Sequence, residues 1–250
     1  MTTFYPILKR EMKSYFASPL AYIVIVVFQV ISATFFFLYL KGFLNFQLDP
    51  AYSLNVGEFN MNSLVLVPYF ETIRLVLLLV IPLITMRLIA DERRNYTAEL
   101  LFTAPISVRS VVIGKFVAAL FLLAIMLALS AINIMILMFH GSPDSGLIIS
   151  GYLGLMLLGA TFLSIGMFAS SLTDNQLIAA VLSLGILLLL WLIGSLSVSS
   201  GSLLGYVSVI NHFDSFGKGY LDLKDLIYYL SLIYLGLYLS YTAIDSERWR

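Results

Sequence analysis

The sequence predicts an all-α membrane protein with six transmembrane helices. Of its 250 residues, 60% are hydrophobic and only 11% are charged. A soluble globule of this size needs a more polar surface, so lipid must cover much of the exterior. A β-barrel would need short segments of alternating polarity, and runs such as LGILLLLWLIG do not alternate. The composition therefore favours a bundle of spanning helices.

Six apolar windows are long enough, or nearly so, for a helix to cross the bilayer core, which takes about 20 residues. No repeat of fixed period is visible, and we expect one transmembrane domain over residues 1–250. The six windows are Leu20–Leu40, Pro68–Ile89, Val111–Phe139, Leu147–Leu172, Leu177–Leu196 and Leu226–Ile244.

An even number of spans places both chain termini on one side of the membrane. Basic residues concentrate on the cytoplasmic side of membrane proteins, which identifies that side. Ten basic residues lie on the side of the termini: Lys9, Arg10, Lys13, Arg87, Arg93, Arg94, Arg109, Lys115, Arg248 and Arg250. Four lie on the opposite side: Lys41, Arg74, Lys218 and Lys224. We therefore expect both termini to be cytoplasmic.

Residues 1–18 are expected to form an amphipathic helix that lies in the inner interface. Apolar residues recur there at helical spacing, whereas Lys9, Arg10 and Lys13 point elsewhere. Ser18-Pro19 ends the segment. An ordinary positively charged flank is the alternative. The apolar run that follows lacks a small-x-small cleavage site, so it is predicted to be a retained span and not a signal peptide.

The segment from Met86 to Phe116 is unusual, because it holds eight of the charged residues of the chain, which has 14 basic and 14 acidic residues in all. Within residues 91–108, Asn95 and Thr97 are typical helix-start residues, and Glu99 suits the positive end of a helix dipole. Leu-Leu-Phe then forms an apolar patch before Pro105 ends the helix. A short helix of this kind is suited to docking in a groove of a partner. A simple solvated loop would explain the basic residues but not the exposed Leu-Leu-Phe.

On the outer side, residues 197–225 mix apolar and polar residues with four glycines, which predicts a re-entrant or interfacial segment. Glu71 and Arg74 lie three residues apart near the outer end of the second span, where they can form an ion pair. Snorkelling toward the outer headgroups explains these two residues equally well. Pro82, in the same span, is expected to kink the helix or to leave a carbonyl without its partner.

The sequence offers no catalytic or metal-binding constellation. It has no cysteine and only two histidines, and neither HExxH nor G-x-S-x-G occurs. Gly114-Lys115 and Gly217-Lys218 lack the rest of a phosphate loop, so we expect no ATP site of that type. We also expect no nucleic-acid binding. A secondary transporter or channel working without ATP remains the alternative function; the scarcity of charges within the spans argues against it, whereas Gln29, Asn133 and Pro82 keep it open.

Four motifs in order resemble the permease subunits of type-2 ABC transporters, most closely the gliding-motility-type branch. The motifs are SPLAY, IPLITMRLIADERRNYTAELLFTAPIS followed by IGKF, IGMFASSLTDNQ, and NHFDSFGKGYLDLKDLIYYLSL. The resemblance covers nearly the whole chain. It implies an N-terminal elbow helix, six spans, and a cytoplasmic coupling helix between the second and third spans. It also implies a multi-pass protein of the bacterial inner membrane.

The resemblance further implies an exporter subunit that is not itself an enzyme. A separate ABC ATPase would bind ATP and Mg, and a second permease, identical or related, would complete the pathway by alternating access. The family resemblance assigns ATPase coupling to Asp91, Glu92, Arg93, Thr97, Glu99, Leu100, Leu101 and Pro105, and a second cytoplasmic loop to Asp174, Asn175 and Gln176. Tyr96 stands where the family commonly has glycine, so a glycine-dependent turn cannot form there unchanged. The transported substrate is not indicated.

Overall fold

All regular elements of the described residues are helical. The structure, a computed structural model, describes residues 4–48, 60–94, 107–196 and 208–247. Six helices within these ranges are long and apolar enough to cross a membrane. They are α2 (Pro19–Leu48), α3 (Val67–Thr85, preceded by a π-helical turn at Asn62–Leu66), α6 (Val108–His140), α7 (Ser145–Ser171), α8 (Gln176–Leu196) and α11 (Leu223–Glu247). The prediction of an all-α protein with six spans is confirmed, and several spans are longer than the apolar windows.

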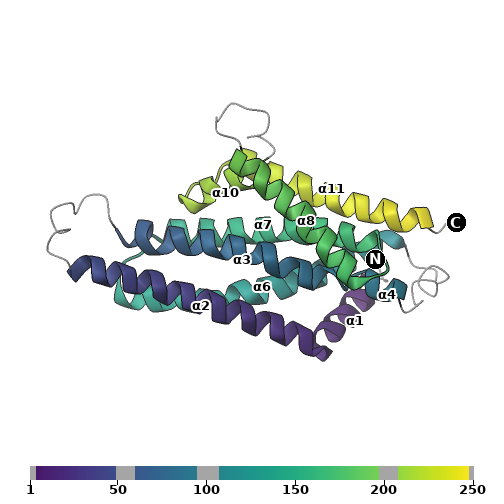
Figure 1. The fold of residues 1–250 in the computed structure, drawn as a ribbon, viewed down its shortest axis with the longest axis horizontal. Helices are drawn as coiled ribbons and strands as arrows, with labels where there is room; N and C mark the ends of the chain where they lie inside the picture. The colour runs from purple at the N-terminus through teal and green to yellow at the C-terminus, as the bar shows by residue number, and fades with distance from the viewer. Residues whose placement is uncertain (1–3, 49–59, 95–106, 197–207, 248–250) are drawn as a thin grey trace.

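Three shorter helices lie at the ends of the bundle. They are α1 (Phe4–Ala17), α4 (Ala90–Arg94) and α10 (Val209–Gly217). Helix α1 ends at Ala17, and after Ser18 the next helix, α2, begins at Pro19, where a missing N–H is tolerated. Figure 1 shows α1 set at an angle to α2, with α4 and the last turn of α11 at the same end of the bundle. We call this the α1 end.

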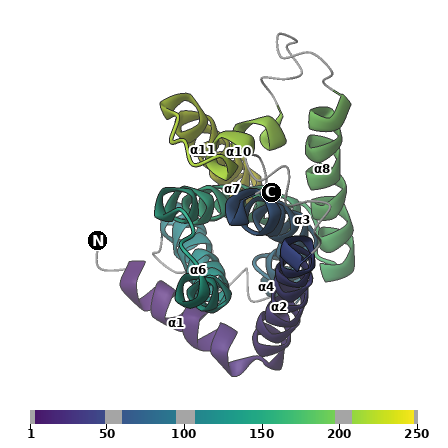
Figure 2. The same cartoon turned by 90° about the vertical axis from the view of Figure 1, so that its left-hand side faces the viewer.

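Helix α7 forms the centre of the bundle. It carries no charged residue and contacts α3, α6, α8, α10 and α11. Figure 2 shows α7 surrounded by α3, α6 and α11. Small residues allow this close packing: a Cβ added at Gly151 would meet the Phe70 ring at 2.6 Å, and one at Gly159 would meet Leu123 Cδ2 at 2.5 Å.

A hydrogen-bonded polar cluster joins α2, α3, α6 and α7 inside the bundle. The Tyr69 hydroxyl lies 2.8 Å from Ser32 Oγ, and Asn133 Nδ2 donates to Ser32 Oγ at 3.1 Å. Ser130 Oγ lies 3.2 Å from the Tyr152 hydroxyl and donates to the Leu127 carbonyl at 2.8 Å. These neutral hydrogen bonds hold the helices together without placing a charge in the apolar interior.

We expect Gly151→Ala to destabilise the bundle. The new methyl group would overlap the Phe70 ring, and overpacking of this kind costs about 1–3 kcal/mol. Gly185→Ala is the matched control, because a Cβ at Gly185 has nothing within 4 Å and alanine favours the helix. Thermal unfolding in detergent should show a lower Tm for Gly151→Ala and an unchanged or higher Tm for Gly185→Ala. Equal Tm values for the two variants would show that α3 and α7 do not pack this closely.

Candidate functional site

Helix α4 is placed by α7 through one hydroxyl group. The chain bends over residues 86–89 after α3, and α4 follows directly. The buried Ser170 Oγ on α7 accepts hydrogen bonds from the backbone N–H groups of Ile89 at 3.2 Å and Ala90 at 3.1 Å. These are amides at a helix start, where intrahelical acceptors are lacking. Helix α4 is thereby fixed to the centre of the bundle.

A four-residue ion cluster joins α4 to α1 and α6. Lys115 on α6 is 3% exposed, and its Nζ lies 2.9 Å from Glu92 Oε1 and 3.3 Å from Glu11 Oε2. Arg10 Nη2 lies 2.9 Å from both Glu11 Oε1 and Glu92 Oε1. The charges of the two carboxylates and the two cations cancel. The buried Lys115 ammonium is compensated by Glu11 on α1 and by Glu92 on α4. A buried cation without such partners would be strongly unfavourable.

Gly114 allows α1 to reach this cluster. A Cβ at position 114 would lie 2.9 Å from Ile7 Cγ2, so α1 crosses α6 where α6 has no side chain. The next residue, Lys115, then reaches Glu11 in the second half of α1. Gly114 therefore permits the close crossing of α1 and α6, and Lys115 forms the ion pair beside it.

A second set of contacts joins α4 to the connection between α7 and α8. Gln176 Nε2 donates to Asp91 Oδ1 at 2.6 Å, and Arg93 Nη1 lies 3.7 Å from Asp174 Oδ1. Asp91, Glu92 and Arg93 are consecutive, and successive helical residues point about 100° apart. Each side chain of α4 therefore contacts a different neighbour.

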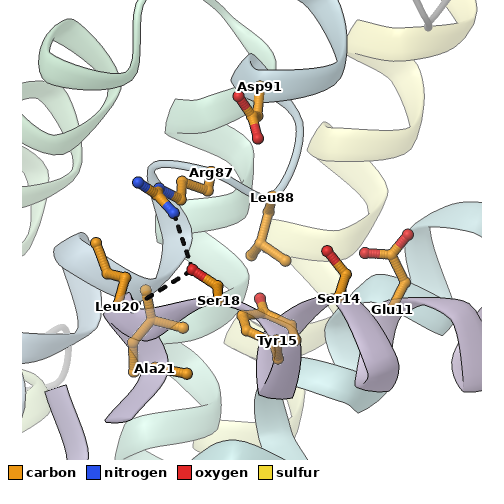
Figure 3. Close-up of a pocket in the computed structure, with 10 residues that line it drawn as sticks. Glu11, Ser14, Tyr15, Ser18, Leu20, Ala21, Arg87, Leu88 and Asp91 are labelled. Atoms are coloured by element: carbon orange, nitrogen blue, oxygen red, sulfur yellow. Dashed lines mark hydrogen bonds between the residues drawn. The ribbon is translucent and has the colours of Figure 1, made fainter. Parts of the chain in front are cut away.

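A small cavity of about 90 Å³ separates α1 from the end of α3 and the start of α4. Figure 3 shows Glu11, Ser14 and Tyr15 on the α1 side, with Arg87 and Asp91 opposite. One contact bridges its rim, where Arg87 Nη1 donates to Ser18 Oγ at 3.3 Å. The cavity therefore lies between two elements that the Arg10–Glu92 ion pair holds together.

The cluster also affects the ionisation of α1. The hydrogen bond with Glu11, more than the charge of Glu92, raises the pKa of Arg10 above its ordinary value, and desolvation opposes the shift. Burial raises the pKa of the Tyr15 phenol strongly. Arg10 therefore stays protonated, and Tyr15 stays neutral, at any physiological pH.

The comparison with protein families agrees with this architecture. Residues 5–247 match the model of the ABC-2 family transporter proteins. The chain belongs to the ABC-2 family. No curated protein shows significant similarity to it. ABC-2 proteins are the membrane components of ABC transporters and normally work with an ABC ATPase. The match is to the whole family, so the gliding-motility-type branch stays a prediction.

The structure brings together several residues that the resemblance assigned to the ABC-2 coupling region. Asp91, Glu92 and Arg93 lie on α4 and contact Gln176, Arg10 and Asp174, as described above. Asn175 instead directly precedes α8, and its Oδ1 accepts a hydrogen bond from the Leu177 amide at 2.9 Å. Lys9 and Lys13 are exposed on α1 and have no ion pair among the described residues. Five predicted coupling residues lie outside the described residues: Thr97, Glu99, Leu100, Leu101 and Pro105.

Sequence reasoning missed the roles of Glu11, Gly114, Lys115 and Ser170. Lys115 had a usable signal, because it lies inside an apolar helix, and a charge there usually has a partner. Its partner Glu11 could not be identified, because the pairing depends on how α1 crosses α6. Ser170 gave no signal among the many small residues of α7.

The possible ion pair between Glu71 and Arg74 is not formed in this structure. Arg74 Nη1 instead lies 3.2 Å from Asp214 Oδ1, and its guanidinium lies 5.1 Å from the Phe213 ring centroid. Helix α10 supplies both partners, whereas Glu71 is exposed. Beside them, His212 Nδ1 lies 2.6 Å from Asp225 Oδ1. Among the described residues, no group of three or more acidic or histidine side chains is arranged to hold a metal ion.

We expect Lys115→Met to destabilise this ABC-2 protein by roughly 3–5 kcal/mol, because it leaves Glu11 and Glu92 partly buried with only Arg10 to compensate them. Lys13→Met is the control, since it removes an exposed cation from α1. Thermal unfolding measures both. Adding Glu92→Gln to Lys115→Met should recover part of the loss. Equal stability of the two single variants would contradict the buried cluster.

Proposed function

We propose that the chain is the membrane-spanning permease subunit of an ATP-driven ABC exporter. In this proposal, separate ATPase subunits dock on residues 91–108, and a second permease, identical or related, completes the pathway. Nucleotide-driven closure of the ATPases would rock the helices between inward and outward states. The observation that carries the proposal is the attachment of α4 to α1, α6 and α7 directly before the predicted coupling residues.

The contacts of α4 support a mechanical role for this region. A force on α4 would act on α6 through Lys115, on α1 through Arg10, and on the start of α8 through Gln176. Three parts of the bundle thus share one attachment point. A solvated loop that only obeyed the positive-inside rule would need none of these contacts.

The scarcity of charge within the spans supports an external source of energy. Between Gly146 and Thr173, and again between Asn175 and Phe213, the sequence has no Asp, Glu, Lys or Arg. Ion-coupled carriers usually place ionisable groups or interrupted helices at the bilayer midplane. Hydrolysis of ATP in a partner protein would then supply the work that an ion gradient supplies in such carriers.

Gentle purification tests the class of transporter. We expect an ABC ATPase to co-purify with the permease and ATP hydrolysis to depend on both proteins. A complex without a nucleotide-binding subunit, whose transport is indifferent to ATP, would refute the proposal and favour a secondary transporter or channel.

Substitutions in the coupling segment test the docking role. We expect Glu99→Ala or Leu100→Asp to weaken ATPase docking by more than about tenfold, as loss of an interface anchor does. Transport-coupled ATP hydrolysis should fall while membrane insertion stays intact. Ser231→Ala is the control, because Ser231 is exposed on α11 and its hydroxyl bonds only within its own helix. Unchanged coupling in both test variants would rule out docking at this segment.

Cysteine labelling tests the orientation, because the chain has no native cysteine. Asp174 has a side chain that is 76% exposed at the α1 end, and Tyr220, which follows α10, is 71% exposed. In intact cells, a membrane-impermeant maleimide should label Tyr220→Cys, and it should label Asp174→Cys only after permeabilisation. The reverse pattern would place the α1 end outside the cell and exclude ATPase docking there.

A further inference from the structure

A groove of about 320 Å³ runs between α6 and α11 at the α1 end. Its volume lies within the range of small-molecule sites. Its wall combines one cation with apolar and aromatic side chains, namely Arg109, Ile113, Tyr234, Leu237, Tyr238 and Tyr241. None of these residues takes part in the α4 contacts. The groove is therefore separate from the α4 contacts.

Arg109 lies at the mouth of this groove in the first turn of α6. Its guanidinium lies 5.3 Å from the Tyr241 ring centroid, which orients the cation beside the groove. Within the part of the chain that the structure describes, no carboxylate lies within ion-pairing distance of Arg109. The start of a spanning helix is at the level of the lipid headgroups. Arg109 is thus a cation at headgroup depth whose compensating anion is not supplied by these residues.

The tyrosines continue the groove toward the bilayer core. Tyr234 and Tyr238 stack with ring centroids 6.3 Å apart and are 71% and 51% exposed. Tyr234 precedes Tyr241 by seven residues along α11, which corresponds to roughly 10 Å at a helical rise of 1.5 Å per residue. Ile113 adds an apolar side chain from α6. One end of the groove is therefore cationic, and the other suits a hydrocarbon chain.

We propose that this groove binds an anionic phospholipid from the leaflet at the α1 end, with the phosphate on Arg109 and part of an acyl chain along Tyr238 and Tyr234. Basic pockets between transmembrane helices bind anionic headgroups in this way, and the planar guanidinium forms two parallel bonds to a phosphate. A second copy of this chain would fit less well, because its apolar surface would cover Arg109 without an anion. The proposal does not depend on an ATPase, so either proposal can fail alone.

Native mass spectrometry of the detergent-purified full chain tests the site. The probes are phosphatidylglycerol and phosphatidylcholine with identical palmitoyl-oleoyl chains. We expect the first phosphatidylglycerol to bind about tenfold or more tightly than phosphatidylcholine, and we expect Arg109→Gln to abolish this preference. Lys13→Gln is the matched control, because it removes an exposed charge at the same end. Arg109→Lys keeps the charge without the planar fork and should bind between wild type and Arg109→Gln.

Three results would overturn the proposal. Equal binding of the two lipids to the wild type would show that the protein does not distinguish an anionic headgroup from a zwitterionic one. If Arg109→Gln and Lys13→Gln lose the preference for phosphatidylglycerol equally, the preference comes from general attraction of anionic lipid to the positive surface and not from the groove. Oxidative crosslinking of Tyr234→Cys into a covalent dimer, in a chain otherwise without cysteine, would show that a second copy covers the groove. If Arg109→Gln does not fold, Arg109→Lys and the crosslinking experiment still decide.

Discussion

The compensation of one buried ammonium group organises the α1 end of the protein. Lys115 is 3% exposed and is balanced by Glu92 and Glu11, which lie on different helices. Desolvating such a group is costly, and removing one partner of a buried ion pair costs about 3–5 kcal/mol. Helices α1 and α4 must therefore stay beside α6 for Lys115 to remain compensated. The position of α1 and the direction in which the chain leaves α3 follow from the same requirement.

The contacts around α4 differ in strength, and the difference bears on how force would spread. Lys115 and Ser170 are buried and tie α4 to α6 and α7. Arg93 and Asp174 are 3.7 Å apart, and the Asp174 side chain is 76% exposed, so solvent screens that pair. A push on α4 would then move α6 and α7 together, while the α7–α8 connection follows more loosely. This agrees with the proposed rocking of a bundle on one attachment point.

The spans could be predicted from the sequence because hydropathy acts locally. Each apolar run satisfies its own backbone as a helix, whatever surrounds it. The charged stretch at Asp91 was identified for the same reason, since it interrupts an apolar pattern. Pairings between helices were not accessible in this way. Glu71, its neighbour on the helix face, was one possible partner for Arg74, but Arg74 contacts Asp214, 140 residues away. The partner of Lys115 depended in the same way on helix packing.

The interior of the bundle and its α1 end resist motion to different degrees. Inside, α2, α3 and α6 are joined by neutral hydrogen bonds among Ser32, Tyr69 and Asn133. Bonds of this kind between membrane helices are worth only about 0.6–2 kcal/mol each, because their groups find other partners when helices shift. The ion cluster at the α1 end contains the buried Lys115 ammonium, and breaking it costs more. Helices α1, α4 and α6 would therefore move as one body at the α1 end, while the interior contacts rearrange. If ATPases dock at the α1 end as proposed, the rigid part of the bundle is the part that receives the force.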